Sequence, residues 1–150
     1  MAAGAWTFYH KAKLNLMNGS IDLDTDSFRM SLFTSASNAA DVTNLTVIGS
    51  VTGELTEAFG YSSSGKPLTG VTWAVGASAS EMRFDATALV WAAAGGDIVN
   101  NKFAVIWKTG ASAGARKLLC YSQLSTSQFT ITSGNTMTIT PSANGIFELN

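Results

Sequence analysis

Apolar and polar residues alternate with a period of two through several segments of this chain, which is the pattern of β-strands. The clearest segment is 102–108, where the large apolar residues Phe103, Val105 and Trp107 recur at every second position. The two residues between them are also apolar, so we expect a central strand that is covered on both faces.

The segment 26–33 shows the cleanest two-sided alternation. Phe28, Met30 and Leu32 alternate with polar residues, which predicts a strand with one buried face. The segment 34–44 that follows has no period and is rich in Ser, Ala and Asn, so we expect a long surface loop. Loops of this length in a compact domain usually carry contacts or cover another element.

Shorter strands are expected along the rest of the chain. They lie at 45–51, 71–75, 82–84, 88–91, 117–124 and 146–149. The strands at 71–75 and 82–84 read as two arms of a loose hairpin, and 117–124 can fold back antiparallel onto 102–108. The segment 54–59 is ambiguous between a strand and a helical turn. The turn-rich segment 60–68 cannot form a central strand of a sheet, because Pro67 has no N–H to donate.

The last pair of strands permits an argument from register. With a three-residue loop at 133–135, Ile131 faces Met137 and Phe129 faces Ile139, so all four apolar side chains lie on one face. A two-residue loop would separate them. We therefore predict a hairpin whose second or third loop residue is left-handed.

One helix is expected, over residues 6–17. Phe8, Ala12 and Leu16 form an apolar stripe, and Gly19 stands where a left-handed C-terminal cap belongs. Many short strands and one short helix predict an all-β fold, an antiparallel β-sandwich that is jelly-roll-like. Immunoglobulin-like connectivity fits the same pattern. We expect one domain over 1–150, with an N-terminal arm and helix (1–19) packed on it.

Composition narrows the classes of partner. Charged residues make up only 13% of the chain, the formal net charge is −1, and no Lys/Arg cluster is visible in the sequence, so we do not expect nucleic acid as a partner. A neutral, hydroxyl-rich surface favours a protein that contacts neighbours. No apolar run approaches the ~20 residues that cross a bilayer, and no secretory signal is visible, so we expect no membrane partner and synthesis in a reducing cytoplasm.

The residues that could carry chemistry are few. His10 is the single histidine and Cys120 the single cysteine, which argues against zinc and against a Ser-His-Asp arrangement, and no G-x-S-x-G pattern occurs. We expect Cys120 to be a small buried hydrophobe. We therefore expect no catalytic residues, no cofactor and no resident metal.

The run Asp22, Asp24 and Asp26 has the D-x-D-x-D start of an EF-hand calcium loop. The next required position, a glycine, is occupied by Ser27, and the position of the bidentate glutamate is Phe33. The pattern fails at the two positions that matter most, so we interpret these acids as a solvated entry to the strand.

Four segments of the chain resemble, in this order, small virion structural proteins of tailed bacteriophages: FYHKAKLNLMNGSIDLDTDSFRMSLFTS, TEAFGYSSSGKPLTGVTW, FDATALVWAAAGGDIVNNKFAVIWKTG and ITPSANGIFELN. The shared marks are the helix leading to IDLDTDSFRMSLF, a turn with Gly60, Tyr61, Gly65, Lys66 and Leu68, then Trp91, and a closing Gly145 to Phe147. Ser63 and Ser64 depart from the pattern, because a glycine is expected before Gly65.

The resemblance implies a β-sandwich that decorates or cements the virion head. Such a protein would bind the major capsid protein on the outside of the shell, as a homotrimer, and stabilise the joints between coat subunits. The candidate interface comprises residues of the N-terminal arm and of the 34–44 loop: Trp6, Phe8, Tyr9, Ser37, Asn38, Asp41 and Asn44.

Two other functions remain open. One is a tail- or fibre-associated jelly-roll module that binds a host glycan or another tail protein, for which Tyr61 and Trp73 would form an aromatic platform. The other is a small hydrolase that depends on His10.

Overall fold

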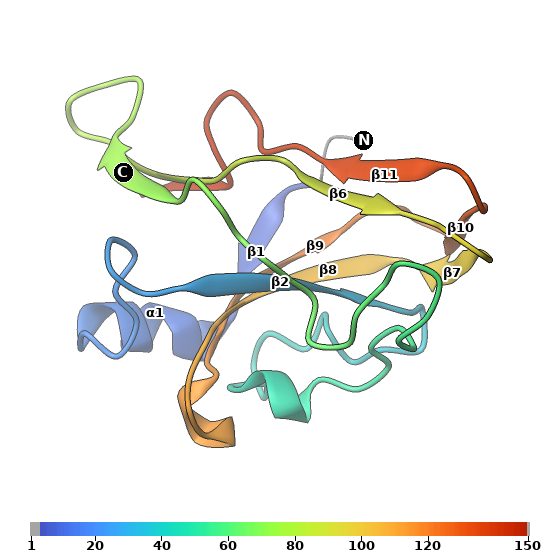
Figure 1. Cartoon of the computed structure of the whole chain (residues 1–150). Helices are drawn as coiled ribbons and strands as arrows, with labels where there is room; N and C mark the ends of the chain where they lie inside the picture. Colours follow the sequence, from blue (N-terminus) through green and yellow to red (C-terminus); the bar gives the residue numbers. More distant parts are fainter. Residues whose placement is uncertain (1–3, 150) are drawn as a thin grey trace.

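The computed structural model describes residues 4–149. Residues 1–3, which belong to the predicted N-terminal arm, and Asn150 lie outside the described residues. The chain is mostly β-strand with one short helix, as predicted, and its centre is a five-stranded antiparallel sheet in the order β1-β9-β8-β2-β3 (Figure 1). These strands are β1 (Trp6–Phe8), β2 (Phe28–Phe33), β3 (Lys66–Pro67), β8 (Phe103–Lys108) and β9 (Leu118–Gln123).

The predicted central strand is confirmed as β8. It lies between β2 and β9, and its residues from Phe103 to Trp107 are all buried. Ile106 pairs with Met30 on one side and with Cys120 on the other. The prediction that β9 folds back onto β8 is also confirmed.

The prediction of a single buried face for β2 is wrong. Ser31 and Phe33, on the face opposite Met30, are fully buried too. The Ser31 Oγ accepts a hydrogen bond from the Trp107 Nε1 at 3.1 Å, so the polar side chain is satisfied without water. Segments of the chain between β2 and β3 pass over this face (Figure 1).

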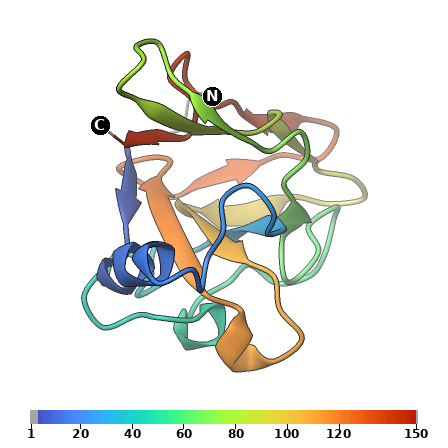
Figure 2. The ribbon, with the colours of Figure 1, turned by 90° about the vertical axis from the view of Figure 1, so that its left-hand side faces the viewer.

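A second layer covers the other face of the central sheet (Figures 1 and 2). It consists of three small antiparallel sheets, β4-β5-β12, β6-β11 and β7-β10. The strands are β4 (Thr72–Val75), β5 (Met82–Asp85), β6 (Leu89–Ala92), β7 (Ile98–Asn101), β10 (Phe129–Ile131), β11 (Thr136–Ile139) and β12 (Phe147–Leu149). The predicted hairpin of β4 and β5 and the closing strand β12 are confirmed.

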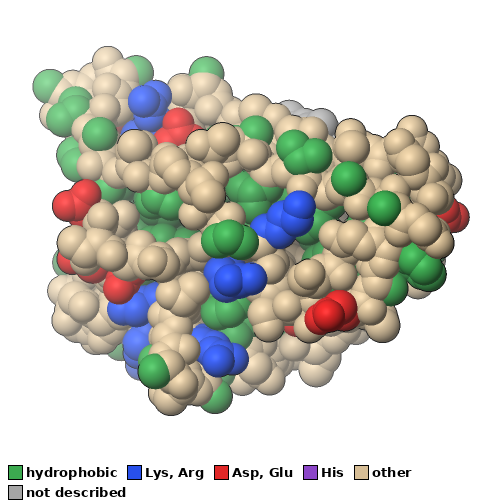
Figure 3. Space-filling view, in the orientation of Figure 1, with side chains coloured by type: hydrophobic (Ala, Val, Ile, Leu, Met, Phe, Trp, Pro, Cys, Tyr) green, Lys and Arg blue, Asp and Glu red, His purple; other side chains and the backbone are tan. Residues whose placement is uncertain are grey.

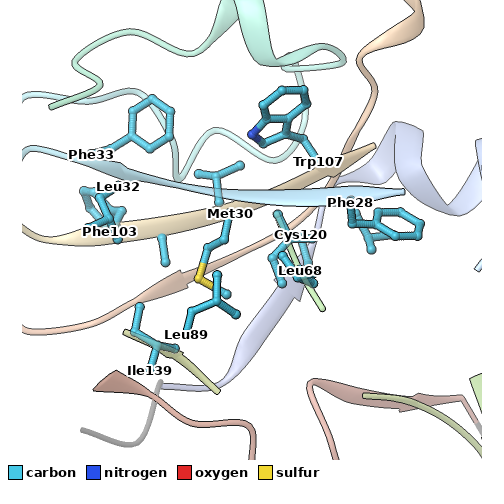
Figure 4. Packing of buried hydrophobic residues seen from close by; sticks show 14 of the residues in the cluster. Phe28, Met30, Leu32, Phe33, Leu68, Leu89, Phe103, Trp107, Cys120 and Ile139 are labelled. Atoms are coloured by element: carbon cyan, nitrogen blue, oxygen red, sulfur yellow. The ribbon is translucent and has the colours of Figure 1, made fainter. Parts of the chain in front are cut away.

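The core joins the two layers. In Figure 4, Met30 points from β2 toward Leu89 and Ile139 of the second layer, while Phe33 and Trp107 lie on the opposite side of the strand. A chain of aromatic contacts crosses the same interior: Phe28 to Phe84 at 5.2 Å, Phe84 to Phe147 at 5.1 Å, and Phe147 to Phe8 at 4.4 Å between ring centroids. The two layers therefore form a β-sandwich.

The predicted hairpin of the last strands is wrong in its pairing. β10 pairs with β7, where Ile131 lies opposite Ile98, and β11 pairs with β6, where Met137 lies opposite Trp91. The turn between them still has a left-handed residue, Gly134 at φ +84°, as predicted. Ile131, Met137 and Ile139 are buried as expected, but β10 and β11 pair in different sheets. Alternation alone does not specify the partner of a strand.

Two other element predictions also need correction. The helix α1 spans His10–Met17, because Trp6–Phe8 is taken by β1, which extends the sheet along the edge of β9. The predicted strand at 45–51 is instead a short 3₁₀ turn, Ile48–Ser50, after a single bridge from Val47 to Lys117. The left-handed Gly19 after the helix, at φ +73°, is confirmed.

Candidate interaction surfaces

The N-terminal part of the predicted interface is largely built into the fold. Tyr9 is fully buried, and its hydroxyl donates a hydrogen bond to the Ala39 carbonyl at 2.7 Å. Burial, reinforced by the neighbouring Cys120 and Tyr121, raises the pKa of Tyr9 far above its ordinary value. Phe8 is half-buried against Phe147. Tyr9 therefore holds the 34–44 loop in place and is not available to a partner.

Trp6 remains partly open. It lies in β1 opposite Ser122 of β9, and it lines a pocket with Thr140 and Ile146. Of the three N-terminal residues, Trp6 is the one whose position fits a contact with another molecule.

The loop part of the predicted interface lies next to the start of the helix, because the His10 N–H donates to the Val42 carbonyl at 2.9 Å. Asn38 joins the loop to the next segment: its Nδ2 donates to the Ser50 carbonyl at 3.1 Å, and its Oδ1 accepts from the Thr52 N–H at 2.8 Å. These hydrogen bonds give the loop a fixed shape.

The other candidate interface residues of the loop also form hydrogen bonds within it. The Asp41 carboxylate accepts hydrogen bonds from Asn44 and from the Thr43 N–H, which lower the pKa of Asp41. The Ser37 Oγ accepts a bond from the Ala39 N–H at 3.0 Å. The structure thus brings the two predicted segments together, and the polar side chains of the loop stabilise its conformation by hydrogen bonds.

The acids of the Asp22–Asp26 segment form a compact turn. The Asp22 carboxylate accepts bonds from the N–H groups of Asp24 and Thr25, which lower the pKa of Asp22. Asp26 accepts from the Asp22 N–H and forms an ion pair with the Lys108 Nζ at 2.7 Å.

The residues with potential chemistry are dispersed. His10 is exposed at the start of α1, and Cys120 is fully buried, which raises the pKa of its thiol. Within residues 4–149, no three His, Cys, Asp or Glu side chains gather as metal ligands would. In the same residues, no helix is long and apolar enough to cross a membrane.

The aromatic platform required by the glycan-binding alternative is not formed. Tyr61 is 2% exposed, and its hydroxyl donates to Glu54 Oε1 at 2.7 Å and accepts from the Leu32 N–H at 3.1 Å. Burial, followed by the charge of Glu54, raises the pKa of Tyr61 far above its ordinary value. Trp73 lies half-buried on β4, so the two rings cannot bind a sugar together.

The structure adds an interaction surface that the sequence did not suggest, the outer edge of β4. This strand ends its sheet, with β5 on one side only. Gly76, just after β4, donates its N–H to the Glu81 carbonyl, so the alternation of an antiparallel ladder turns the backbone groups of Trp73 and Val75 away from β5. The strand carries no charge and no proline, and Val75 is 58% exposed.

An apolar groove of about 340 Å³ is lined in part by β4 and by β12, the two outer strands of the same sheet. Its apolar lining residues come from α1, the segment after it, β4 and β12: Leu16, Met17, Ile21, Leu23, Trp73 and Leu149. Met17 is 87% exposed, which is unusual for a large apolar side chain. Trp73 thus connects β4 to an apolar groove that also reaches the other outer strand of the sheet.

Comparisons of the chain with protein-family models, with curated proteins and with solved structures give no match. The resemblance to phage virion proteins thus rests on the sequence motifs alone.

Proposed function

We propose that this chain is a structural protein of a phage virion that binds the outside of the head as a decoration or cement protein. In this proposal it acts without catalysis, assembles as a homotrimer, and stabilises joints between major capsid subunits. The order of the sequence motifs over nearly the whole chain supports the family, and the exposed edge of β4 with its apolar groove supports the mode of action.

The observation that carries the proposal is this exposed edge. Soluble proteins usually protect the outer strands of their sheets with Lys, Pro or a bulge, because unpaired backbone groups pair readily with other chains. β4 has none of these protections, and its Val75 is exposed. Met17, which lines the same groove as Trp73 of β4, is exposed too. An extended segment of a coat subunit can pair with the backbone of β4 and place its apolar side chains in the groove.

The test is the copy number of this chain in purified particles, measured by quantitative mass spectrometry against the major capsid protein. A ratio near one, or a simple fraction of it, is the expected result for a protein on the head lattice. A handful of copies per particle would contradict the proposal and place the chain in the tail or at the portal.

The oligomeric state needs a separate measurement. Sedimentation equilibrium of the purified chain should give three times the chain mass of 15.7 kDa. A monomer at all concentrations would remove the trimer from the proposal and leave head binding to be judged by the copy number.

A further inference from the structure

Two arginines from distant parts of the chain line one open pocket of about 310 Å³. Arg29 comes from β2 and Arg116 from the turn before β9, and the remaining lining residues are Ser64, Trp107, Thr109 and Gly110. Figure 3 shows Lys and Arg side chains gathered near the middle of the face that it displays. None of the lining residues carries a negative charge.

The turn before β3 holds the Arg29 side chain. Its Nε donates to the Ser64 carbonyl at 2.8 Å and its Nη2 to the Gly65 carbonyl at 2.7 Å. Ser64 and Gly65 both have left-handed backbones, at φ +70° and +67°. A Cβ on Gly65 would lie 2.1 Å from the Met30 carbonyl oxygen, so only glycine fits there. Two constrained residues thus aim their carbonyls at one guanidinium.

The Arg116 side chain is held by a single hydrogen bond. Its Nε donates to the Gly110 carbonyl at 3.2 Å, and in residues 4–149 no hydrogen bond reaches its terminal nitrogens. The ion pair of Lys108 with Asp26 is the single one among the described residues, so neither arginine has a carboxylate within 4.0 Å. Two oriented cations with free N–H donors therefore face the same open space.

We propose that this pocket binds one carboxylate of a partner protein, an Asp or Glu side chain or a chain terminus. The guanidinium group presents parallel N–H donors that match the two oxygens of a carboxylate. The identity of the partner as a coat subunit rests on the proposed function, whereas the carboxylate chemistry rests on the pocket itself.

The surroundings favour a single carboxylate over a polyanion. Glu54 accepts from the Ser64 N–H at 2.8 Å and Glu57 from the Ser63 Oγ at 2.6 Å, so two acids contact the turn that holds Arg29. In Figure 3, acidic side chains flank the basic group on both sides. A nucleic-acid strand would bring further phosphates against these acids, while one carboxylate would not.

The first test observes the arginine side chains directly by NMR. The probes are acetyl-Gly-Glu-Gly-amide and its neutral match, acetyl-Gly-Gln-Gly-amide. The chain has three arginines, and Arg83, whose Nη1 donates to the Ala143 carbonyl elsewhere, is the internal control. We expect the Nε–H signals of Arg29 and Arg116 to shift with the glutamate peptide only, and Arg83 to stay unchanged.

Three results of this titration would overturn the proposal. They are no shift, equal shifts with both peptides, and equal shifts at all three arginines. Tighter binding of a short oligonucleotide than of the glutamate peptide at the same two signals would also overturn it, in favour of nucleic acid.

The second test measures binding to purified heads that lack this chain. The double variant Arg29→Gln with Arg116→Gln should bind about tenfold more weakly or worse, with a larger loss at about 50 mM than at about 300 mM NaCl. Lys11→Gln with Lys13→Gln makes the same change of net charge on α1 and should bind within about twofold of the unchanged chain.

Failure of the two proposals can be distinguished. If the unchanged chain does not bind heads, the proposed function fails, and the NMR titration still decides the carboxylate site. If the arginine variant binds as well as the lysine variant, the carboxylate proposal fails while head binding stands. Arg116→Gln alone, at an exposed residue, guards against misfolding of the Arg29 variant and should weaken binding about threefold or more.

Discussion

Two of the strands that end their sheets, β3 and β4, are protected very differently. β3 consists of Lys66 and Pro67; the proline has no N–H to offer, and the Lys66 Nζ turns back to the Val90 carbonyl at 2.5 Å and lies 5.8 Å from the centre of the Trp91 ring. β4, at Thr72–Val75, has neither a charge nor a proline. The difference indicates that residues of the chain itself block strand pairing at the β3 edge, whereas the β4 edge is available to a strand of another chain.

The largest expected effect comes from disrupting the turn before β3, which supports the protected edge. Gly65→Val should lower the free energy of unfolding by about 3 kcal/mol or more, because the position is left-handed and the new Cβ would collide with the Met30 carbonyl. Urea denaturation measures this change. The control is Gly49→Val, which meets no atom within 4 Å and should cost less than about 1 kcal/mol. Equal losses in the two variants would show that the turn does not need its glycine.

The exposed edge is tested by adding the protection that it lacks. Val75→Lys should weaken binding to heads about tenfold and leave the unfolding midpoint nearly unchanged, because a lysine on an open edge opposes strand pairing. Binding is measured by co-sedimentation with heads. Val99→Lys is the matched control, since Val99 is 47% exposed on β7, and it should bind as the unchanged chain does. Equal losses of binding in both variants would contradict the proposal that the β4 edge is the binding edge.

Alkaline pH should destabilise the fold through Tyr61, which supports the β3 side, as well as through Tyr9. Tyr61 packs under the turn before β3, and its folded pKa is raised above the unfolded value, so its contribution is complete below about pH 10 and declines as the pH rises further. For each tyrosine that stays protonated in the folded state, the free energy of unfolding falls by about 1.4 kcal/mol between pH 7 and pH 11, because the unfolded chain can ionise that tyrosine. β4 has no titratable side chain.

Urea midpoints at pH 7 and pH 11 measure this decline. Tyr61→Phe should make the decline shallower, and Tyr9, which is also buried with a raised pKa, should retain its own share. An unchanged slope in Tyr61→Phe would contradict the assignment to Tyr61.

The smallest expected effect is at the protecting lysine itself. Lys66→Ala should cost about 1 kcal/mol, because it removes both the hydrogen bond to Val90 and the contact with the Trp91 ring. Thermal unfolding measures the loss. Lys13→Ala, an exposed lysine of α1, should cost almost nothing, and a similar cost in both would mean that Lys66 is only a surface charge.

Much of the strand content was predictable because it depends on neighbours in the sequence. The alternation around Val105 and around Met30 identified β8 and β2, and the turn residues correctly placed left-handed glycines at Gly19 and Gly134. The second buried face of β2 was not predictable, since Ser31 looks the same in the sequence whether it meets water or the Trp107 indole. The candidate interface residues Tyr9 and Asn38 were recognised as notable, but their contacts are internal.

The sequence by itself determined that segments such as β2, β8 and β9 are strands and that the chain turns at Gly19 and Gly134, because these follow from local alternation and from the conformational freedom of glycine. The tertiary structure alone decided that β10 and β11 join different sheets, that β4 is left open while β3 is protected, and that Arg29 and Arg116 meet in one pocket. Each of these depends on which distant segments become neighbours, and the choice among buried strands is made by the packing of the whole core.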